Sequence, residues 1–421
     1  MKKFLFSLIC LFVLGSSLFG WDVYSGANDA TKAVLAKVDA LIEQEQYQSA
    51  FGATNGEGCQ EEYLLAKRIE IATNYFAQSF NHNIFAFTNL KEGQTLYDVR
   101  TGGGNFSVMM VDPVTVAESY MAANGGKPVL YYALGAYYAD VRGRYGDQLS
   151  FSFDELYEKE IENFGKAYDA GVYDAFSLSE LGVSYAYLGD NDSAISIYEA
   201  KEKEYELTGD DDYNYGFCFL RKGQTEKGAY YLESSIDKYA DNPQYQYDSY
   251  SLVVQVYIMT LKDFESAGKV LLNFKKDFPT DYRVTLFTIL FYAAQNLNDQ
   301  AIESSFELFA MAPTNPSACQ LIMQQGQSAG NMEFLPGFFD QALVLYAENS
   351  GAVANLYFHY AYTLCLMQRN EEAWNMVLKA REAFTQNGTL TSDIEQSLDQ
   401  IQNQIMLNAG APFDAVRNMA Q

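Results

Sequence analysis

The side chains available as bases at neutral pH are two histidines, His82 and His359, in a chain of 421 residues. His82 lies in Asn81-His82-Asn83, a run typical of a turn. His359 falls inside an apolar helical segment, where a packed histidine is commoner than a catalytic one. Neither has a serine or cysteine beside it in a nucleophile arrangement. We therefore expect no catalytic residue among these groups.

Two short motifs resemble ligand-binding loops but lack the residues that bind. The run 102–104 is three glycines without the lysine and Ser/Thr of a phosphate loop, so it predicts a turn. The run 190–193 lacks the glycine and terminal glutamate of a calcium loop. It predicts a turn between helices with Asp192 or Ser193 as the N-cap. We expect no metal site and no cofactor; weak cation binding at 210–212 is the alternative to a solvated junction.

Paired carboxylates for glycosidase chemistry stay open among the 54 acidic residues, because only geometry identifies them. The cysteines after the first twenty residues are Cys59, Cys218, Cys319 and Cys365, with no pair spaced for zinc. We expect free, buried thiols that act as small hydrophobic side chains. The alternative is that a curved chain pairs Cys218 with Cys319 or Cys365.

The formal net charge of −26 makes nucleic acid a poor partner, and we expect none, because binding it needs clustered Lys and Arg. The acidity favours solubility, or else it steers a basic partner or attracts cations.

The first twenty residues predict a cleaved signal peptide. Lys2 and Lys3 precede an apolar run, Phe4–Leu14, and small residues follow up to Gly20, after which we expect the cut. No later stretch is long and apolar enough to span a membrane. We expect a periplasmic or secreted protein with no transmembrane span once the leader is removed.

An internal repeat lies behind these isolated motifs. Five positions recur 34 residues later with similar side chains, Gly182, Tyr185, Gly189, Ala194 and Tyr198 matching Gly216, Phe219, Gly223, Gly228 and Leu232. A fixed period of this size predicts a solenoid of helical hairpins. Stacked repeats share one continuous core, so length alone does not give the number of domains.

Residues 21–126 predict irregular helical repeats. Residues 27–45 and 47–53 form a first hairpin, and Tyr63–Phe80 is the next helix. Two runs, Thr95–Arg100 and Phe106–Val111, flank the glycine-rich link and predict a β-hairpin inserted within a repeat. Asp112-Pro113 predicts the start of the repeat's second helix.

Residues 127–386 predict the regular solenoid. Its first repeat carries Leu134, Gly135 and Tyr138 and has a long link at 142–152. Insertions at 84–111 and 142–152 are candidate binding loops, because insertions in repeat proteins usually map to one face. In residues 387–421, the segment Thr391–Leu407 predicts an amphipathic helix that caps the stack, followed by a tail.

The spacing in residues 175–208 resembles the tetratricopeptide repeat (TPR). Its pattern is met by Leu178, Leu181, Gly182, Tyr185, Ala194 and Tyr198. The resemblance covers residues 127–313 and 354–386, and it departs at Gly228, at a missing proline after the first copy and throughout 22–126. It implies an all-α, right-handed α-solenoid, here with the small β-hairpin insertion and the C-terminal capping helix.

The resemblance also implies an inner groove lined by the first helix of each hairpin. By phase, the groove positions are Phe176, Val183, Tyr187, Tyr213, Phe217, Leu220, Arg221, Leu252, Val256, Arg283 and Leu286. Most are apolar or aromatic, so an apolar or extended peptide fits better than a clamped carboxylate. The alternative is that neighbouring repeats or the capping helix cover these side chains.

These observations favour a non-enzymatic exported scaffold that binds a protein or peptide in an envelope-associated assembly. The second hypothesis is a small-ligand or transport accessory protein that holds an apolar or sugar ligand in an aromatic groove. An enzyme is the third. The departures from the repeat suggest that the N-terminal insertions also carry function.

Overall fold

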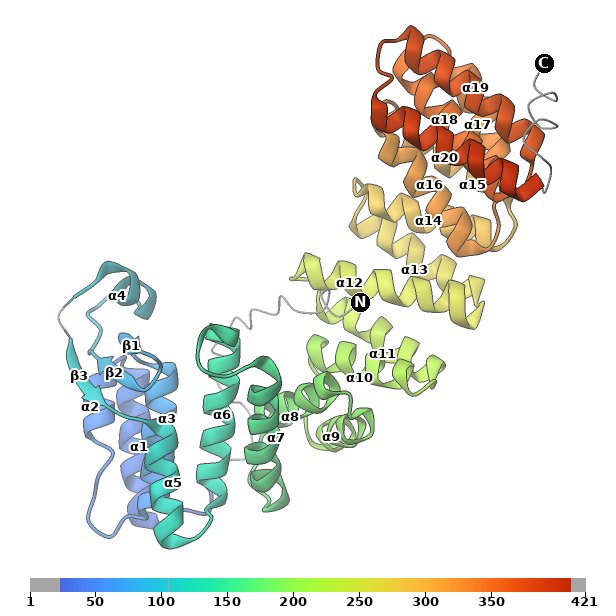
Figure 1. Ribbon diagram of the computed structural model, residues 1–421. Coiled ribbons are helices and arrows are strands. Elements are labelled where there is room, and N and C mark those ends of the chain that lie inside the picture. Colours follow the sequence, from blue (N-terminus) through green and yellow to red (C-terminus); the bar gives the residue numbers. More distant parts are fainter. Residues whose placement is uncertain (1–22, 105, 410–421) are drawn as a thin grey trace. The chain divides into compact units, whose positions relative to one another are not determined.

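The computed structural model describes residues 23–104 and 106–409 (Figure 1). The chain divides into two compact units, Met1–Gln224 and Thr225–Gln421. The division falls between α10 (Gly209–Arg221) and α11 (Thr225–Lys238), the two helices of the second sequence copy. The predicted signal peptide lies outside the described residues. None of the helices in the described part is long and apolar enough to cross a membrane.

The first unit consists of paired helices and a small sheet. Its further elements are α1 (Asp29–Glu43), α2 (Tyr47–Gly52), α3 (Glu61–Asn74), β1 (Gln78–Phe80), β2 (Ile84–Phe87), α4 (Leu96–Gly102), β3 (Ser107–Met110), α5 (Pro113–Asn124), α6 (Pro128–Tyr145), the short 3₁₀ turn η1 (Gly146–Gln148), α7 (Phe153–Asp169), α8 (Ala175–Leu188) and α9 (Asn191–Glu204). Successive helices pack as antiparallel pairs, and α3 packs against α6 beside it (Figure 1).

The second unit is a stack of helices. After α11 come α12 (Pro243–Gln255), which continues into the π-helical turn η2 (Val256–Leu261), then α13 (Phe264–Asp277), α14 (Tyr282–Ala294), α15 (Asn298–Met311), α16 (Pro316–Ala329), α17 (Phe334–Leu345), α18 (Ser350–Leu366), α19 (Asn370–Gln386) and α20 (Ser392–Ala409). The helix α20 packs on α18 and α19. Leu398, Ile401 and Ile405 place its apolar stripe in the core.

Close contact within each hairpin explains the glycines of the repeat. A Cβ on Gly182 in α8 would lie 2.7 Å from the ring of Tyr198 in α9. A Cβ on Gly135 in α6 would lie 2.6 Å from the ring of Phe164 in α7. Ala194 is also fully buried. The positions predicted to bring paired helices together do so in these two hairpins, and an aromatic ring fills the space opposite Gly182 and Gly135.

Side-chain caps fix where these helices begin. The Ser152 hydroxyl accepts from the Glu155 amide, and the Glu155 carboxylate accepts from the Ser152 amide, which together satisfy two helix-terminal donors. The N-cap of α9 is Asp190, whose carboxylate accepts from the Ser193 amide at 3.1 Å. The prediction of Asp192 or Ser193 at that cap was wrong by two to three residues. The predicted start of α5 at Asp112 is confirmed.

The small β insertion of the N-terminal third is confirmed, but its strands differ from the predicted pair. β2 pairs antiparallel with both β1 and β3, in the register Ser79 opposite Phe85 and Phe85 opposite Met109. The segment 95–100, predicted as a strand, lies mostly in α4. Its helix begins because Thr95 and Asp98 form a reciprocal capping box, which outweighs the strand propensity of the residues between them.

Two further boundaries differ from prediction. The helix α3 ends at Asn74 rather than Phe80, because the last residues of that run enter β1. The helix α6 continues to Tyr145, so the predicted link at 142–152 starts too early and its residues 142–145 are helical. As expected, α3 and α5 pack together as one repeat with the insertion between them.

A buried ionic network crosses α6, α7 and α8. The Arg142 guanidinium donates to the Glu160 carboxylate, with Nε and Oε1 2.7 Å apart, and also to Glu180. The Ser184 hydroxyl donates to the other Glu160 oxygen at 2.8 Å. Burial, with repulsion from Glu180, raises the pKa of Glu160 to about 7 against the attraction of Arg142. A second buried pair, Lys201 with Asp211, joins α9 to α10.

Cys59, Cys218, Cys319 and Cys365 are free thiols. Cys218, Cys319 and Cys365 are buried, as predicted, whereas Cys59 is partly exposed. Burial raises the pKa of Cys319 to about 12, so this thiol stays protonated at neutral pH.

Candidate partner-binding cleft

The first unit contains a cleft of about 610 Å³, lined mainly by the first helix of each helical pair. The helices α1, α3 and α6, the start of α8 and the segment at Val23 and Tyr24 supply its walls. Residues on one helical face line it, such as Asp39 and Glu43 four apart on α1. Ala66 and Ala133 leave room between the helices because their side chains are short.

The charge of the cleft lining is strongly negative. The lining contains five carboxylates, those of Asp39, Glu43, Glu70, Asp140 and Asp174, and a single lysine, Lys67. The buried Lys67 ammonium lies 2.7 Å from oxygens of both Asp39 and Glu70. Burial alone would lower the pKa of Lys67, but the two carboxylates raise it, so the lysine is charged at neutral pH. Asp39 and Glu43 are exposed at the edge of the cleft.

Tyrosines hold the inner carboxylates in place. Tyr24 donates its hydroxyl to Glu70 at 2.7 Å, and Tyr132 donates to Asp174 at 2.8 Å. Burial and the neighbouring carboxylates raise the pKa of both phenols, so they stay protonated and keep donating. Asp174 also accepts from the Ser177 amide at the start of α8. The cleft thus presents fixed carboxylates among aromatic rings, an arrangement suited to cations.

A buried His–Asp contact lies beside the cleft. His82, in the β1–β2 turn, has a φ of +54° and is fully buried, with Nε2 2.8 Å from Asp140 Oδ2. Its ring stacks on Tyr137 with centroids 5.5 Å apart. Arg144 donates to the other Asp140 oxygen at 2.6 Å. His82 is a turn residue, as predicted, but it also lies against Asp140, a contact that no local sequence signal revealed.

The sequence-predicted groove positions of the first unit are partly or well exposed, namely Phe176, Val183, Tyr187, Tyr213, Phe217, Leu220 and Arg221. Only Phe176 among them lines the cleft. Tyr187 stacks on Tyr157 at 4.0 Å, and Arg221 lies over the Phe217 ring and donates to the Ala186 carbonyl. Several of these side chains are therefore engaged within the unit.

The groove positions of the second unit are Leu252, Val256, Arg283 and Leu286. Val256 is buried, so it offers little surface to a partner, and Leu286 packs against the core. Arg283 lies 3.8 Å from the Tyr247 ring centroid and pairs with Asp281. It is committed to intramolecular contacts.

The cleft carboxylates were missed in the sequence because they come from α1, α3, α6 and the N-cap of α8, which are far apart in the chain. The i, i+4 spacing of Asp39 and Glu43 was a usable signal. It would have placed both residues on one face once the repeat phase was extended to the first hairpin. Within the described residues, no three His, Cys, Asp or Glu side chains are placed to hold a metal ion.

The stacked hairpins define the class of this protein: it has a TPR-type helical repeat fold. No protein-family model and no curated protein sequence matches the chain. Among solved structures, it is similar to a tetratricopeptide repeat protein from Parabacteroides merdae ATCC 43184, with 14% identity, coverage of 66% of this chain and 98% of that one, and a TM-score of 0.38.

Two other solved structures are similar over part of the chain. One is the C-terminal part of a TPR repeat-containing protein from Cytophaga hutchinsonii, with 15% identity, coverage of 57% and 94%, and a TM-score of 0.36. The other is the Cut9–Hcn1 hetero-tetramer of APC/C, with 14% identity, coverage of 69% and 55%, and a TM-score of 0.31.

Proposed function

We propose that this protein is a non-enzymatic exported scaffold that binds a basic segment of a protein partner in an envelope-associated assembly. The observation that carries the proposal is the cleft of the first unit, whose lining contains five carboxylates and one lysine. Export is supported by the leader-like sequence of the first twenty residues.

The chemistry of the cleft favours a lysine or arginine side chain over an anion or a purely apolar group. Glu43 has no ion-pair partner among the described residues, and Asp39 keeps an exposed carboxylate beside its contact with Lys67. Aromatic side chains, Tyr24, Tyr132 and Phe176, line the same space and can pack on the aliphatic stem of the guest. The net charge of −26 steers a basic partner toward the protein.

Site-directed photo-crosslinking in the native cells tests this proposal. Phe176 is replaced by p-benzoylphenylalanine, which keeps an aromatic ring in the cleft. The control carries the same group in place of Tyr230, an exposed residue of α11 in the second unit. We expect one discrete protein adduct from the cleft position alone, with the crosslinked peptide containing Lys or Arg. Equal crosslinking from both positions, or an adduct peptide without basic residues, would contradict the proposal.

A further inference from the structure

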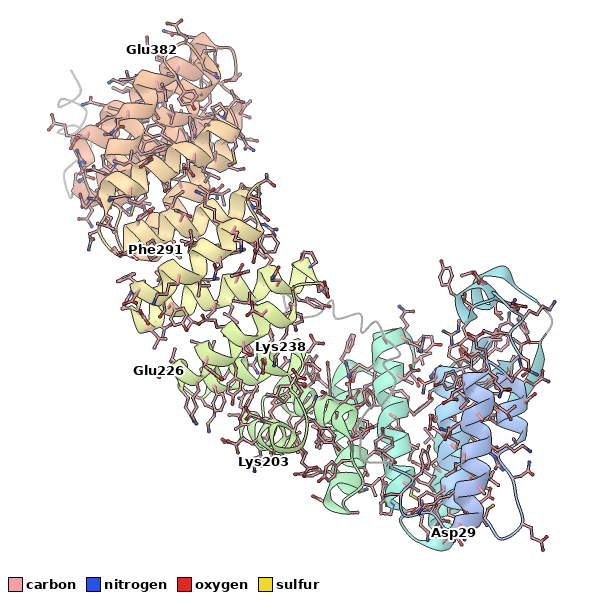
Figure 2. The ribbon with its side chains drawn as sticks, turned by 180° about the vertical axis from the view of Figure 1, so that it is seen from behind. Asp29, Lys203, Glu226, Lys238, Phe291 and Glu382 are labelled. Carbon is pink, nitrogen blue, oxygen red and sulfur yellow. The ribbon has the colours of Figure 1, made fainter. Side chains whose placement is uncertain are left out.

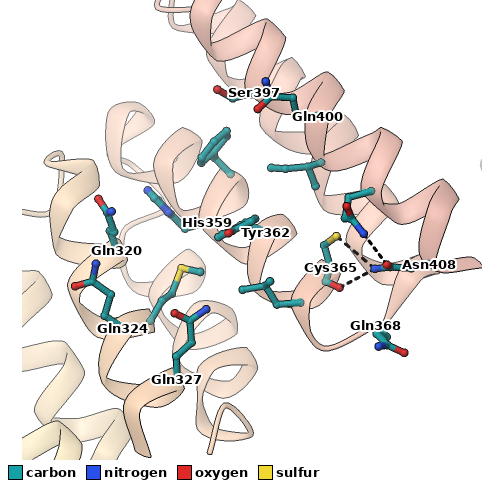
Figure 3. A pocket seen from close by; sticks show the side chains of 15 residues that line it. Gln320, Gln324, Gln327, His359, Tyr362, Cys365, Gln368, Ser397, Gln400 and Asn408 are labelled. Atoms are coloured by element: carbon teal, nitrogen blue, oxygen red, sulfur yellow. Dashed lines mark hydrogen bonds between the residues drawn. The ribbon is translucent and has the colours of Figure 1, made fainter. Parts of the chain in front are cut away.

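The second unit contains a cavity of about 860 Å³ of different chemistry, between α16, α18 and α20 (Figure 3). None of its lining residues is an Asp, Glu, Lys or Arg. In a chain with 54 acidic and 28 basic residues, this uncharged lining sets the cavity apart from the surrounding surface. Its volume is in the range of small-molecule sites.

Side-chain amides line two of its walls. Gln320, Gln324 and Gln327 lie along one face of α16, and Gln400 lies on α20 across the cavity (Figure 3). These four amides make no side-chain hydrogen bond to another described residue. By contrast, the Asn408 amide is fixed by the Cys365 carbonyl at 3.2 Å. Each unengaged glutamine therefore offers both a donor and an acceptor to a guest.

His359 on α18 adds a buried polar atom to the cavity wall. The residue is only 9% exposed, and its Nε2 has no hydrogen-bond partner among the described residues. Burial lowers the pKa of His359 to about 4, so the imidazole is neutral at pH 7. A buried polar atom without a partner costs free energy, which a hydrogen bond from a bound molecule would recover.

Apolar side chains complete the lining. Phe358, Tyr362 and Leu366 follow one another at four-residue spacing on α18 and line the same cavity. Tyr362 is 43% exposed and Leu366 is 40% exposed, so both present surface to a guest. An aromatic side chain beside neutral donors and acceptors suits a molecule with an apolar face and hydroxyl groups around its rim.

We propose that this cavity binds an uncharged polyhydroxylated ligand, a neutral sugar unit. Its hydroxyl groups would bond the glutamine amides and His359 Nε2, and its C–H face would pack on Tyr362. An ionic ligand would lose its hydration without meeting an opposite charge in the lining. A purely apolar ligand would leave the amides unpaired. This site is independent of the cleft in the first unit.

Saturation-transfer NMR and calorimetric titration of the full chain with maltose, cellobiose, lactose and N,N-diacetylchitobiose test the proposal. Glucosamine and glucuronic acid serve as charged control ligands. A neutral Gly-Ser peptide serves as the control for peptide binding. We expect at least one neutral sugar to bind with a Kd in the millimolar range or below, and the charged sugars to bind more weakly.

Three variants assign the binding to the cavity. Tyr362→Ala and Gln324→Ala should each raise the Kd by about tenfold, whereas Tyr230→Ala, at an exposed site outside the cavity, should leave it unchanged. Circular dichroism checks that each variant is folded. Failure of every neutral sugar to bind at millimolar concentration would overturn the inference. So would an unchanged Kd in Tyr362→Ala, or binding of the peptide in place of the sugars.

Discussion

At the scale of single residues, the environment of each titratable side chain decides its charge and hence what it can bind. Lys67 stays charged because two carboxylates contact it, so it is committed to the cleft wall. His359 is neutral because burial opposes its protonation. The cleft of the first unit thus carries fixed negative charge, whereas the cavity of the second unit has no charged side chain in its lining. We therefore expect the two sites to bind different ligands.

The buried His359 predicts an acid-sensitive component of stability. Its pKa falls from about 6.5 in the unfolded chain to about 4 in the folded protein. Above pH 6.5 the histidine is neutral in both states. As the pH falls toward 4, the unfolded chain binds the proton first, so folding stability is lost, on the order of 3 kcal/mol in all.

The variant His359→Gln does not titrate, so it should lose less stability than the parent between pH 7 and pH 4.5. In a Trp21→Phe background the remaining tryptophan, Trp374 of α19, reports urea unfolding of the second unit alone. Identical pH dependence in parent and variant would refute this assignment.

At the scale of elements, close packing between paired helices restricts which side chains fit at the repeat glycines. Gly182→Ala would push a methyl group to 2.7 Å from the Tyr198 ring, so we expect a loss of roughly 1–3 kcal/mol in unfolding free energy. Gly165→Ala in α7 meets no atom within 4 Å, and it should be neutral or stabilising by about 0.5–1 kcal/mol. Urea unfolding of the two variants tests the contrast, and equal effects would contradict it.

The buried network predicts a second element-scale effect. Arg142→Met removes the cation that Glu160 and Glu180 share, so we expect a loss of about 3–5 kcal/mol. Lys222→Met removes a more exposed pair with Asp192 and should cost less than about 1 kcal/mol. Thermal unfolding followed by far-UV circular dichroism compares them, and a larger loss in Lys222→Met would show that the network contributes little.

Periodic features of this chain could be predicted, and features built from distant contacts could not. Gly182 and Tyr198 could be predicted because the same spacing recurs 34 residues later in the sequence. The segment at Thr95 was mistaken for a strand because its capping box outweighs its strand-forming residues. The Arg142 network and the His82 contact with Asp140 join residues far apart in sequence, so no local pattern reveals them.

At the scale of the whole molecule, the sequence repeat and the compact units do not coincide. The 34-residue period continues through α10 and α11, yet the division into units falls between them. The period therefore predicts the positions of the helices, but it does not indicate the boundary between the two compact units. Phase alone also assigned Val256 to the groove, whereas this residue begins the π-helical turn η2 and is buried.

The second unit has its own extensive core, with Phe338, Phe339 and Leu364 fully buried among many partners. We therefore expect residues 225–421 expressed alone to fold into a helical protein. Far-UV circular dichroism should show a helical spectrum and a cooperative thermal transition. A fragment that is helical but melts without cooperativity would show that this unit depends on the first.

The most direct test of the proposed partner chemistry is a fluorescence-anisotropy titration with labelled hexalysine, hexaglutamate and a neutral Gly-Ser peptide. The test variant is Asp39→Asn with Glu43→Gln, at the edge of the cleft. The control is Glu371→Gln with Glu382→Gln on α19, which changes the net charge equally (Glu382 is labelled in Figure 2).

We predict that hexalysine alone binds, that about 1 M salt abolishes binding, and that the cleft variant weakens it about fivefold or more. The α19 control should bind like the parent. Equal weakening by the two double variants would assign the binding to overall charge, and binding of hexaglutamate or the neutral peptide in preference to hexalysine would contradict the proposed function.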